Sequence, residues 1–570
     1  MAPSTAGAGA EAEYDLSISQ RACLGSFCAL LVLWIYSEIL SRKASSELDT
    51  PSPHRKPDRE EEAMELLPVT ASLDPSAEVP AAHLNGMHAP CSPRPPLSAA
   101  ALVAPGGALS WAAIRGSGLA RCVLLDRAAL VSALPTLRAA VEGGAWIMWF
   151  FLADRTALLN STGRIYSRDT FLFMFLALAT CAALASQRPT GRPPAVLNRG
   201  QTEEWKGWMQ VLFLLYHYYS AKEVYNAIRV FIAAYVWMTG YGNFAYYYKT
   251  SDFGMGRFCQ MMWRLNALVV VCCLALNNSY MLYYICPMHT LFTVFVYAAL
   301  GLGHAHNKRP GVIWAKLAAC LVLTHLLWMN RSVFDLVWRP LRPLLAYTNP
   351  ARPEGDPMHE WFFRTGLDRY VWVHGMACAA LLPRWEAALA ALAALGCKAR
   401  RGARAAVLAV CALVGYTWYA HVFSKPKLEY NALHPYTSWI PITVFIVVRN
   451  LTPGLRSANL VLFGWLGAVT LETYIGQFHT WLLTRRPDGQ PVLLLDLLPG
   501  YPLLNFGMAT GVYILVSHRL HTTTLTLRDA LVPHDDDARL LRNAVMGLAL
   551  AGGLYAVTVA GVGLAAALAR

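Results

Sequence analysis

Residues 202–217 read TEEWKGWMQVLFLLYH, and this stretch indicates the fold class of the chain. Thr202 carries the hydroxyl typical of a helix N-cap, and the two glutamates after it would fall in the first turn, where the helix dipole favours negative charge. The rest of the stretch is apolar enough to enter a membrane, and Trp205 and Trp208 suit the membrane interface. The pattern predicts a membrane-entering helix that begins at Thr202.

This predicted helix carries two ionisable side chains on one stripe, Lys206 and His217. A spacing of eleven residues returns to within about 20° of the same face, roughly 16 Å deeper. Ionisable groups within a membrane are costly unless they face a polar cavity, so the pair is a candidate functional site. An alternative stays open, in which Lys206 extends to the interface and His217 only hydrogen-bonds a neighbouring helix.

The composition of the whole chain agrees with a membrane protein. Of 570 residues, 56% are hydrophobic and only 15% are charged, which is unlike an ordinary soluble protein. The apolar residues recur in blocks that approach the roughly 20 helical residues needed to cross a bilayer, and such blocks must be helices because lipid offers no partner to free backbone groups. We therefore predict an all-α, polytopic transmembrane helical bundle with roughly 12–14 membrane helices, some short or broken.

The chain divides into four predicted parts. Residues 1–21 form an N-terminal tail, 22–40 a signal-anchor helix, 41–133 a largely disordered linker rich in Pro, Ala, Ser and Glu, and 134–570 the membrane domain. Within the membrane domain we mark apolar spans at 134–152, 170–185, 208–220, 226–246, 262–276, 281–302, 312–328, 371–382, 387–395, 405–421, 439–448, 460–482, 503–516 and 544–568. Between 330 and 370 lies either an amphipathic interfacial segment or an ordered loop.

The net charge of +13 is spread over short connectors, so it reflects membrane topology and gives no indication of nucleic acid. The basic run at 398–404 favours the cytosol. The sequon at Asn160 favours the lumen, although three arginines in the same connector oppose it. The sidedness of His217 stays open. The 13 cysteines contain no Cys-x-x-Cys pair and most lie in apolar runs, so no metal site is predicted.

Other polar side chains fall at or inside the predicted helices. Arg229 and Arg264 cannot lose their charge, so each needs a carboxylate, carbonyls or a ligand phosphate, unless it is only a topology charge at a helix end. Glu472 and His479 are two helical turns apart in an apolar stretch and would share a face. They either hold adjacent helices together or take part in proton transfer as catalytic residues.

Three further segments are candidates for binding a substrate. His289 follows Pro287, and His434 begins a proline-punctuated aromatic run. Tyr241 and Asn243 open a tyrosine-rich cluster that could form a rim for a sugar, although interfacial tyrosines are common. The sequence contains no P-loop, dinucleotide fingerprint, metalloprotease helix motif or nucleophile elbow.

The blocks 201–210 (QTEEWKGWMQ), 225–244 (YNAIRVFIAAYVWMTGYGNF), 284–292, 434–441 and 470–481 together resemble a known membrane acyltransferase domain. It is shared by plant reduced wall acetylation proteins, fungal capsule O-acetylation proteins and animal sialic acid O-acetyltransferases. The resemblance covers about 134–520 and looks strongest to the plant and algal type. More distantly, Lys206 and His217 resemble the Arg-x10-His helix of the acyltransferase-3 superfamily, with Lys in place of Arg.

This resemblance implies a membrane O-acetyltransferase of the Golgi, with acetyl-CoA from the cytosol as donor and a cell-wall or other glycan as lumenal acceptor. It implies Lys206, Arg229 and Arg264 as phosphate-binding residues and His217 as general base or transient acetyl acceptor. Animal and fungal relatives have a Gly-Asp-Ser domain where this chain has only 41–130, so a separate lumenal transferase is an expected partner. The alternatives are an acetyl-CoA or acetyl-group transporter and a structural scaffold.

Overall fold

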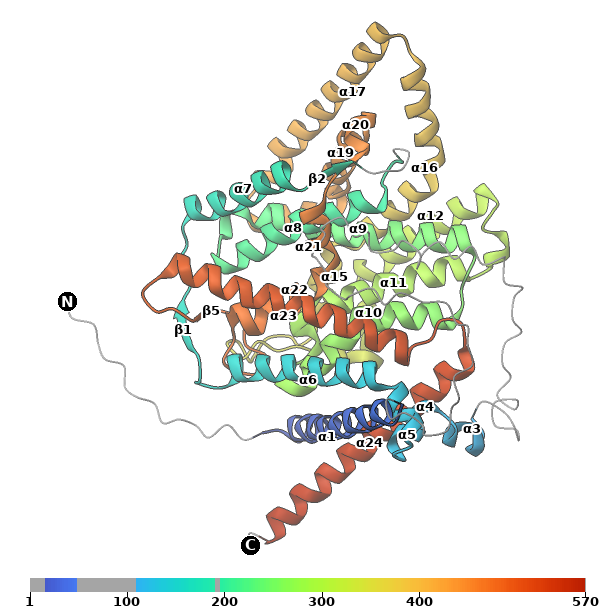
Figure 1. Ribbon diagram of the computed structural model, residues 1–570. Coiled ribbons are helices and arrows are strands. Elements are labelled where there is room, and N and C mark those ends of the chain that lie inside the picture. The colour runs from blue at the N-terminus through green and yellow to red at the C-terminus, as the bar shows by residue number, and fades with distance from the viewer. Residues whose placement is uncertain (1–15, 49–108, 190–194, 569–570) are drawn as a thin grey trace, which may run out of the picture.

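The computed structural model describes residues 16–48, 109–189 and 195–568, most of them in long helices (Figure 1). Helices suit apolar segments because they satisfy all their backbone groups internally. The longest ones are α1 (Ile18–Leu48), α6 (Leu134–Arg155), α7 (Arg168–Ala185), α8 (Arg199–Tyr218), α9 (Tyr225–Thr250), α10 (Met255–Leu276), α11 (Ile285–Gly301), α12 (Pro310–Met329), α16 (Val371–Ala394), α17 (Cys397–Trp418), α19 (Trp439–Asn450), α23 (Pro502–Leu531) and α24 (Asp537–Leu568).

Seven helical segments of the described chain are long and apolar enough to cross a membrane. They are Ile18–Ser45, Arg168–Ala185, Met255–Leu276, Pro310–Met329, His359–Ala394, Cys397–Phe423 and Asp537–Leu568. The predicted all-α polytopic bundle is confirmed. The number of crossings stays a prediction, because α8 and α9 are long enough to span but carry more polar residues.

Two small antiparallel sheets join loops that are distant in sequence. One has the strand order β1 (Asn160–Gly163), β5 (Leu493–Asp496), β4 (Leu482–Leu483), with Asn160 opposite Asp496. The other pairs β2 (Gln187–Pro189) with β3 (Ala458–Leu460). The two sheets lie at opposite ends of α7, so they mark the two ends of the bundle around it.

Two connecting segments are more ordered than the sequence suggests. Helix α1 continues to Leu48, and α3 (Trp111–Arg115), α4 (Gly118–Val123) and α5 (Arg127–Ser132) occupy the end of the predicted linker, while 49–108 lie outside the described residues. The connector 330–370 forms the short helices α13 (Arg331–Trp338), α14 (Arg342–Leu345) and α15 (His359–Leu367), in which Trp338 and Trp361 are buried against each other.

Helix bounds differ from the prediction where capping or proline decides them. Helix α8 begins at Arg199, because the Asn198 side chain accepts a hydrogen bond from the Gln201 amide at 3.0 Å. Thr202 is therefore inside the helix, where its hydroxyl donates to the carbonyl of Arg199. The spans predicted at 371–382 and 387–395 form the single helix α16, which continues through Pro383.

Two pairs of glycines let the central helices pack backbone to backbone. On α8, Gly207 faces the carbonyl of Phe463, and Gly467 of α21 (Val461–Ala468) faces the carbonyl of Glu203. Gly240 of α9 and Gly375 of α16 repeat the arrangement. Small residues at such crossings are typical of helix packing in membranes, where close van der Waals contact holds helices together. These contacts fix α8 and α9 against the core.

Replacing Gly207 by alanine is expected to destabilise the protein. The new Cβ would overlap the Phe463 carbonyl, a backbone group that cannot rotate away. Overpacking costs roughly 1–3 kcal/mol, and we expect the free energy of unfolding to fall by an amount near the upper end of that range. Thermal unfolding followed by size-exclusion chromatography in detergent measures it. Gly464→Ala on α21 is the matched control, since nothing lies within 4 Å of its Cβ position. Equal melting temperatures for the two variants would show that the close contact at Gly207 does not limit stability.

Candidate active site

Lys206 and His217 both lie on α8 and are both partly exposed. The first half of α8 packs on α21, and its last turn reaches the end of the bundle that carries β1. There the carbonyl of His217 accepts a hydrogen bond of 2.9 Å from Arg164, just after β1. Eleven residues of helix separate the two side chains by roughly 16 Å along the axis. The helix thus presents a cation and an imidazole at two levels of the bundle.

The His217 ring has no hydrogen-bond partner among the described residues. It lies between aromatic rings, 4.6 Å from Phe213 and 5.0 Å from Tyr216 between centroids. The guanidinium groups of Arg164 and Arg364 are within electrostatic range of it, and Arg364 stacks on Tyr284 at 4.4 Å. A partly exposed imidazole with free nitrogens is available to a ligand.

Lys206 is held by the helix to which it belongs. Its ammonium lies 2.6 Å from the carboxylate of Glu203, and its side chain keeps 28% exposure. The two tryptophans beside it, predicted to lie at the membrane interface, pack against other aromatic rings of the bundle. Trp205 is buried, 4.5 Å from the Phe445 ring, and Trp208 packs edge-on against Phe231. Trp205 lies in the core because α8 and α21 approach each other closely at this turn, whereas Trp208 stays partly exposed.

Arg264 and Glu472 form an ion pair between α10 and α22 (Thr470–Gly476). A second contact between Arg264 Nη2 and Glu472 Oε2 measures 2.9 Å, and Nη2 lies 3.1 Å from Nδ1 of His521 on α23. Glu472 is fully buried, whereas Arg264 and His521 keep 23% and 19% side-chain exposure. Glu203, the partner of Lys206, is within electrostatic range of Arg264. Lys206 and Arg264 therefore belong to one charged region.

His289 lies on α11 near this region. Its Nδ1 is 2.7 Å from the hydroxyl of Thr239, and Lys206 is within electrostatic range. The other predicted sugar-binding residues are buried: Tyr241 stacks on Trp237 at 4.9 Å, and Asn243 donates to the carbonyl of Thr239 on its own helix. Among the four predicted substrate-binding residues, only His289 is partly exposed.

The fourth of them, His434, belongs to a buried ion-pair cluster that also contains Arg229. One oxygen of Asp368 lies 2.7 Å from Arg229 Nη2 and the other 3.3 Å from His434 Nε2. Tyr430 completes the cluster at 2.9 Å from His434 Nδ1. These charged side chains are at most 1% exposed. Asp368 was not predicted from the sequence. The only signal for it there is that a carboxylate stands just before the apolar stretch of α16.

His479 lies in a second sealed cluster, apart from Glu472. Its Nδ1 is 2.7 Å from Asp154 Oδ2 and its Nε2 is 2.6 Å from the hydroxyl of Tyr283. The sequence analysis missed both partners. Glu472 and His479 do not share a face, because α22 gives way to the π-helical turn η7 (Gln477–Trp481), which changes the angle between successive residues. Neither ring nitrogen of His479 is free.

The part of the chain that the structure describes contains no group of three or more His, Cys, Asp or Glu side chains placed to hold a metal ion. Partly exposed cations lie at both levels, Lys206 and Arg264 at one and Arg164 and Arg364 at the other. They suit an anionic ligand that is bound through hydrogen bonds and charge.

Comparison with known proteins identifies a family and a curated relative. The model of a family described as the 10 TM acyl transferase domain found in Cas1p matches residues 126–545. An N-acetylneuraminate (7)9-O-acetyltransferase of Danio rerio is 31% identical over 413 residues, which is 70% of this chain and 51% of the relative. The chain thus spans about half the length of that curated relative. No solved structure matches it.

Proposed function

The chain belongs to the family of ten-span membrane acyltransferase domains found in Cas1p, and we propose that it transfers acetyl groups from cytosolic acetyl-CoA toward glycan hydroxyls in the Golgi lumen. The activity named for the Danio rerio relative, O-acetylation of N-acetylneuraminate, supports an acetyl donor and a sugar acceptor. The acceptor class we propose is a cell-wall or other polysaccharide, reached directly or through a separate lumenal transferase. We also propose that membrane lipid surrounds the protein and that the transfer needs no metal.

The observation that carries this proposal is the free imidazole of His217, partly exposed on the helix that presents Lys206 about three turns earlier. An unpaired ring inside a membrane protein is useful only if a ligand or water reaches it. Imidazole can accept a proton near neutral pH and can also act as a nucleophile.

We assign donor binding to the charged region around Lys206. Coenzyme A carries several phosphate charges. Lys206 and Arg264 are partly exposed cations of this charged region and would face those phosphates. Glu472 then positions Arg264. Arg229 is buried, and its Nη2 pairs with the buried carboxylate of Asp368, so we give it a structural role instead of the phosphate-binding role expected from sequence. His479, with both nitrogens occupied, likewise serves as a positioning residue.

The acetyl group moves at the level of His217. As a general base, His217 removes the proton of the acceptor hydroxyl while that oxygen forms a bond to the thioester carbonyl, and coenzyme A leaves as the thiolate. As an acetyl acceptor, a ring nitrogen first displaces the thiolate and then yields the acetyl group to the hydroxyl oxygen, which loses its proton. Both routes balance and both need the free ring nitrogen.

We place the Lys206 level toward the cytosol and the His217 level toward the lumen. The sequon residue Asn160 is exposed on β1, at the end of the bundle where Arg164 bonds the His217 carbonyl. A cytosolic donor and a lumenal acceptor would then meet within the membrane.

Proteoliposomes test the proposed function against transport. Acetyl-CoA labelled with ¹⁴C in the acetyl group and ³H in the coenzyme is added outside vesicles that enclose N-acetylneuraminate or a neutral polysaccharide. We expect ¹⁴C esters inside and ³H-coenzyme A outside. Both labels inside the vesicles would favour a transporter. If neither label is transferred, whichever glycan the vesicles enclose, the proposal is contradicted.

Lys206→Gln is expected to raise the KM for acetyl-CoA at least about tenfold with a smaller change in kcat, because a hydrogen bond between charged groups contributes about 1.5–3 kcal/mol. Lys206→Arg should keep most of the affinity. Coenzyme A release with varied acetyl-CoA measures both constants. Lys222→Gln, an exposed lysine at the His217 end, is the control. If Lys206→Gln lowers thermal stability and leaves KM unchanged, Lys206 serves only to pair with Glu203.

A further inference from the structure

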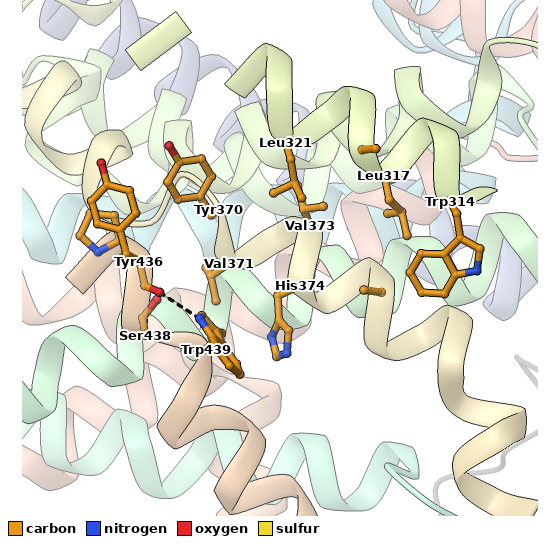
Figure 2. A pocket seen from close by; sticks show the side chains of 13 residues that line it. Trp314, Leu317, Leu321, Tyr370, Val371, Val373, His374, Tyr436, Ser438 and Trp439 are labelled. Carbon is orange, nitrogen blue, oxygen red and sulfur yellow. Dashed lines mark hydrogen bonds between the residues drawn. The ribbon is translucent and has the colours of Figure 1, made fainter. Parts of the chain in front are cut away.

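A long apolar pocket lies between α12, α16 and the start of α19. Its volume is about 570 Å³, within the range of small-ligand sites. Figure 2 shows Tyr370 and Tyr436 at one end and Trp314 at the other, with Leu321 and His374 between them. The pocket is therefore an elongated groove along the helices.

The groove lies between helices of membrane-spanning length and has exposed walls. Helix α12 is one of the segments long and apolar enough to cross a bilayer, and α16 is the larger part of another. Trp314, Leu321 and Trp439 line the groove and keep 38–46% exposure. An exposed apolar groove between membrane helices faces lipid chains, not water.

The tyrosine end of the groove carries a cation. Arg369 donates to the hydroxyl of Tyr436 at 2.7 Å and stacks on the rings of Tyr370 and Tyr436 at 5.0 and 5.2 Å. His325 Nδ1 lies 2.9 Å from the Tyr370 hydroxyl. The Arg369 Nε group is buried without a hydrogen-bond partner. Tyrosines and arginine together are typical of the headgroup level of a bilayer.

We propose that this groove binds one acyl chain of an anionic membrane phospholipid, whose phosphate lies at Arg369. The apolar walls match the chain, and the guanidinium matches the phosphate. Arg369 follows Asp368 directly, so a bound headgroup would lie beside the buried Arg229–Asp368–His434 cluster. This inference does not depend on the proposed acetyl transfer.

Photo-crosslinking in nanodiscs tests the groove. The probes are phosphatidic acid and phosphatidylcholine with a diazirine on the acyl chain, each at low fraction in phosphatidylcholine discs. We expect phosphatidic acid to label peptides that contain 314–321 or 371–377 about tenfold more than phosphatidylcholine does, as one charge-assisted contact allows. Equal labelling by the two probes, or labelling only elsewhere, would overturn the proposal.

Two variants separate the headgroup from the chain. Arg369→Gln should reduce phosphatidic acid labelling to the phosphatidylcholine level, while Arg384→Gln, at an exposed arginine on α16, should not. Ala377→Trp fills the groove and should remove the label from both probes, and Ala412→Trp on α17 is its control. A dimer that Ala377→Trp dissociates would instead assign the groove to a second copy of the chain and overturn lipid binding.

Discussion

Replacing His217 by alanine is expected to lower the rate of acetyl transfer by about 10²–10⁴, the range that a positioned acid–base side chain contributes. The fold should be preserved, because the ring makes no hydrogen bond within the described residues, and the bond from Arg164 goes to the backbone carbonyl, which alanine retains. The measurement is ¹⁴C-acetyl esterification of the enclosed glycan, alongside thermal unfolding in detergent.

The matched control is His304→Ala, a histidine exposed in the loop after α11. It should keep wild-type activity. His217→Gln, which preserves polarity but cannot exchange a proton at neutral pH, should be as inactive as alanine. Mass spectrometry of the His217 peptide after brief exposure to acetyl-CoA then separates the two routes, since only an acetyl acceptor gives a modified peptide. Full activity of a stable His217→Ala protein would remove the central assignment.

The sequence was sufficient for the parts of this site that depend on one helix alone. Lys206 and His217 share a stripe because the α-helix repeats every 3.6 residues, and α8 is continuous across both. The same reasoning failed for Glu472 and His479, where the π-helical turn η7 interrupts the regular repeat. A periodicity argument holds only as far as the backbone stays regular.

Pairings between distant segments could not be predicted from one sequence. Arg229 was expected to need a carboxylate, carbonyls or a phosphate, and Asp368, 139 residues later, supplies the carboxylate. Nothing local distinguishes that aspartate from others in the same connector. Likewise, the residues around Trp205 are typical of a membrane interface, yet the glycine contacts between α8 and α21 place Trp205 in the core. The tertiary packing decides both cases.

The second large effect is expected at Asp154, on the last turn of α6. Its carboxylate accepts hydrogen bonds from the Thr484 amide at 2.5 Å, the Thr484 hydroxyl at 2.7 Å and the Arg485 amide at 2.8 Å, and it also pairs with His479 and Arg155. Asp154 and Arg155 have no exposed side-chain area. One carboxylate thus joins α6 to the segment that follows η7.

Asp154→Ala is therefore expected to destabilise the protein by about 3–5 kcal/mol, the cost of leaving a buried charge without its partner. Arg155 would keep only neutral acceptors, the carbonyl of Leu276, the side chain of Asn278 and the hydroxyl of Thr484. A thiol-reactive dye can follow unfolding, because Cys272 and Cys286 are free and buried. Asp169→Ala is the control: that carboxylate is 92% exposed and 3.6 Å from Arg168, so its loss should cost less than about 1 kcal/mol.

This variant also separates a structural role from a chemical one for the His479 cluster. If the cluster only holds α6 against η7, Asp154→Ala should melt early, and the fraction still folded at low temperature should transfer acetyl groups at a rate close to the wild type. The reason is that His217, not His479, has free ring nitrogens. A protein that unfolds like the wild type but has lost transfer would contradict this argument and assign proton transfer to the Asp154–His479 pair.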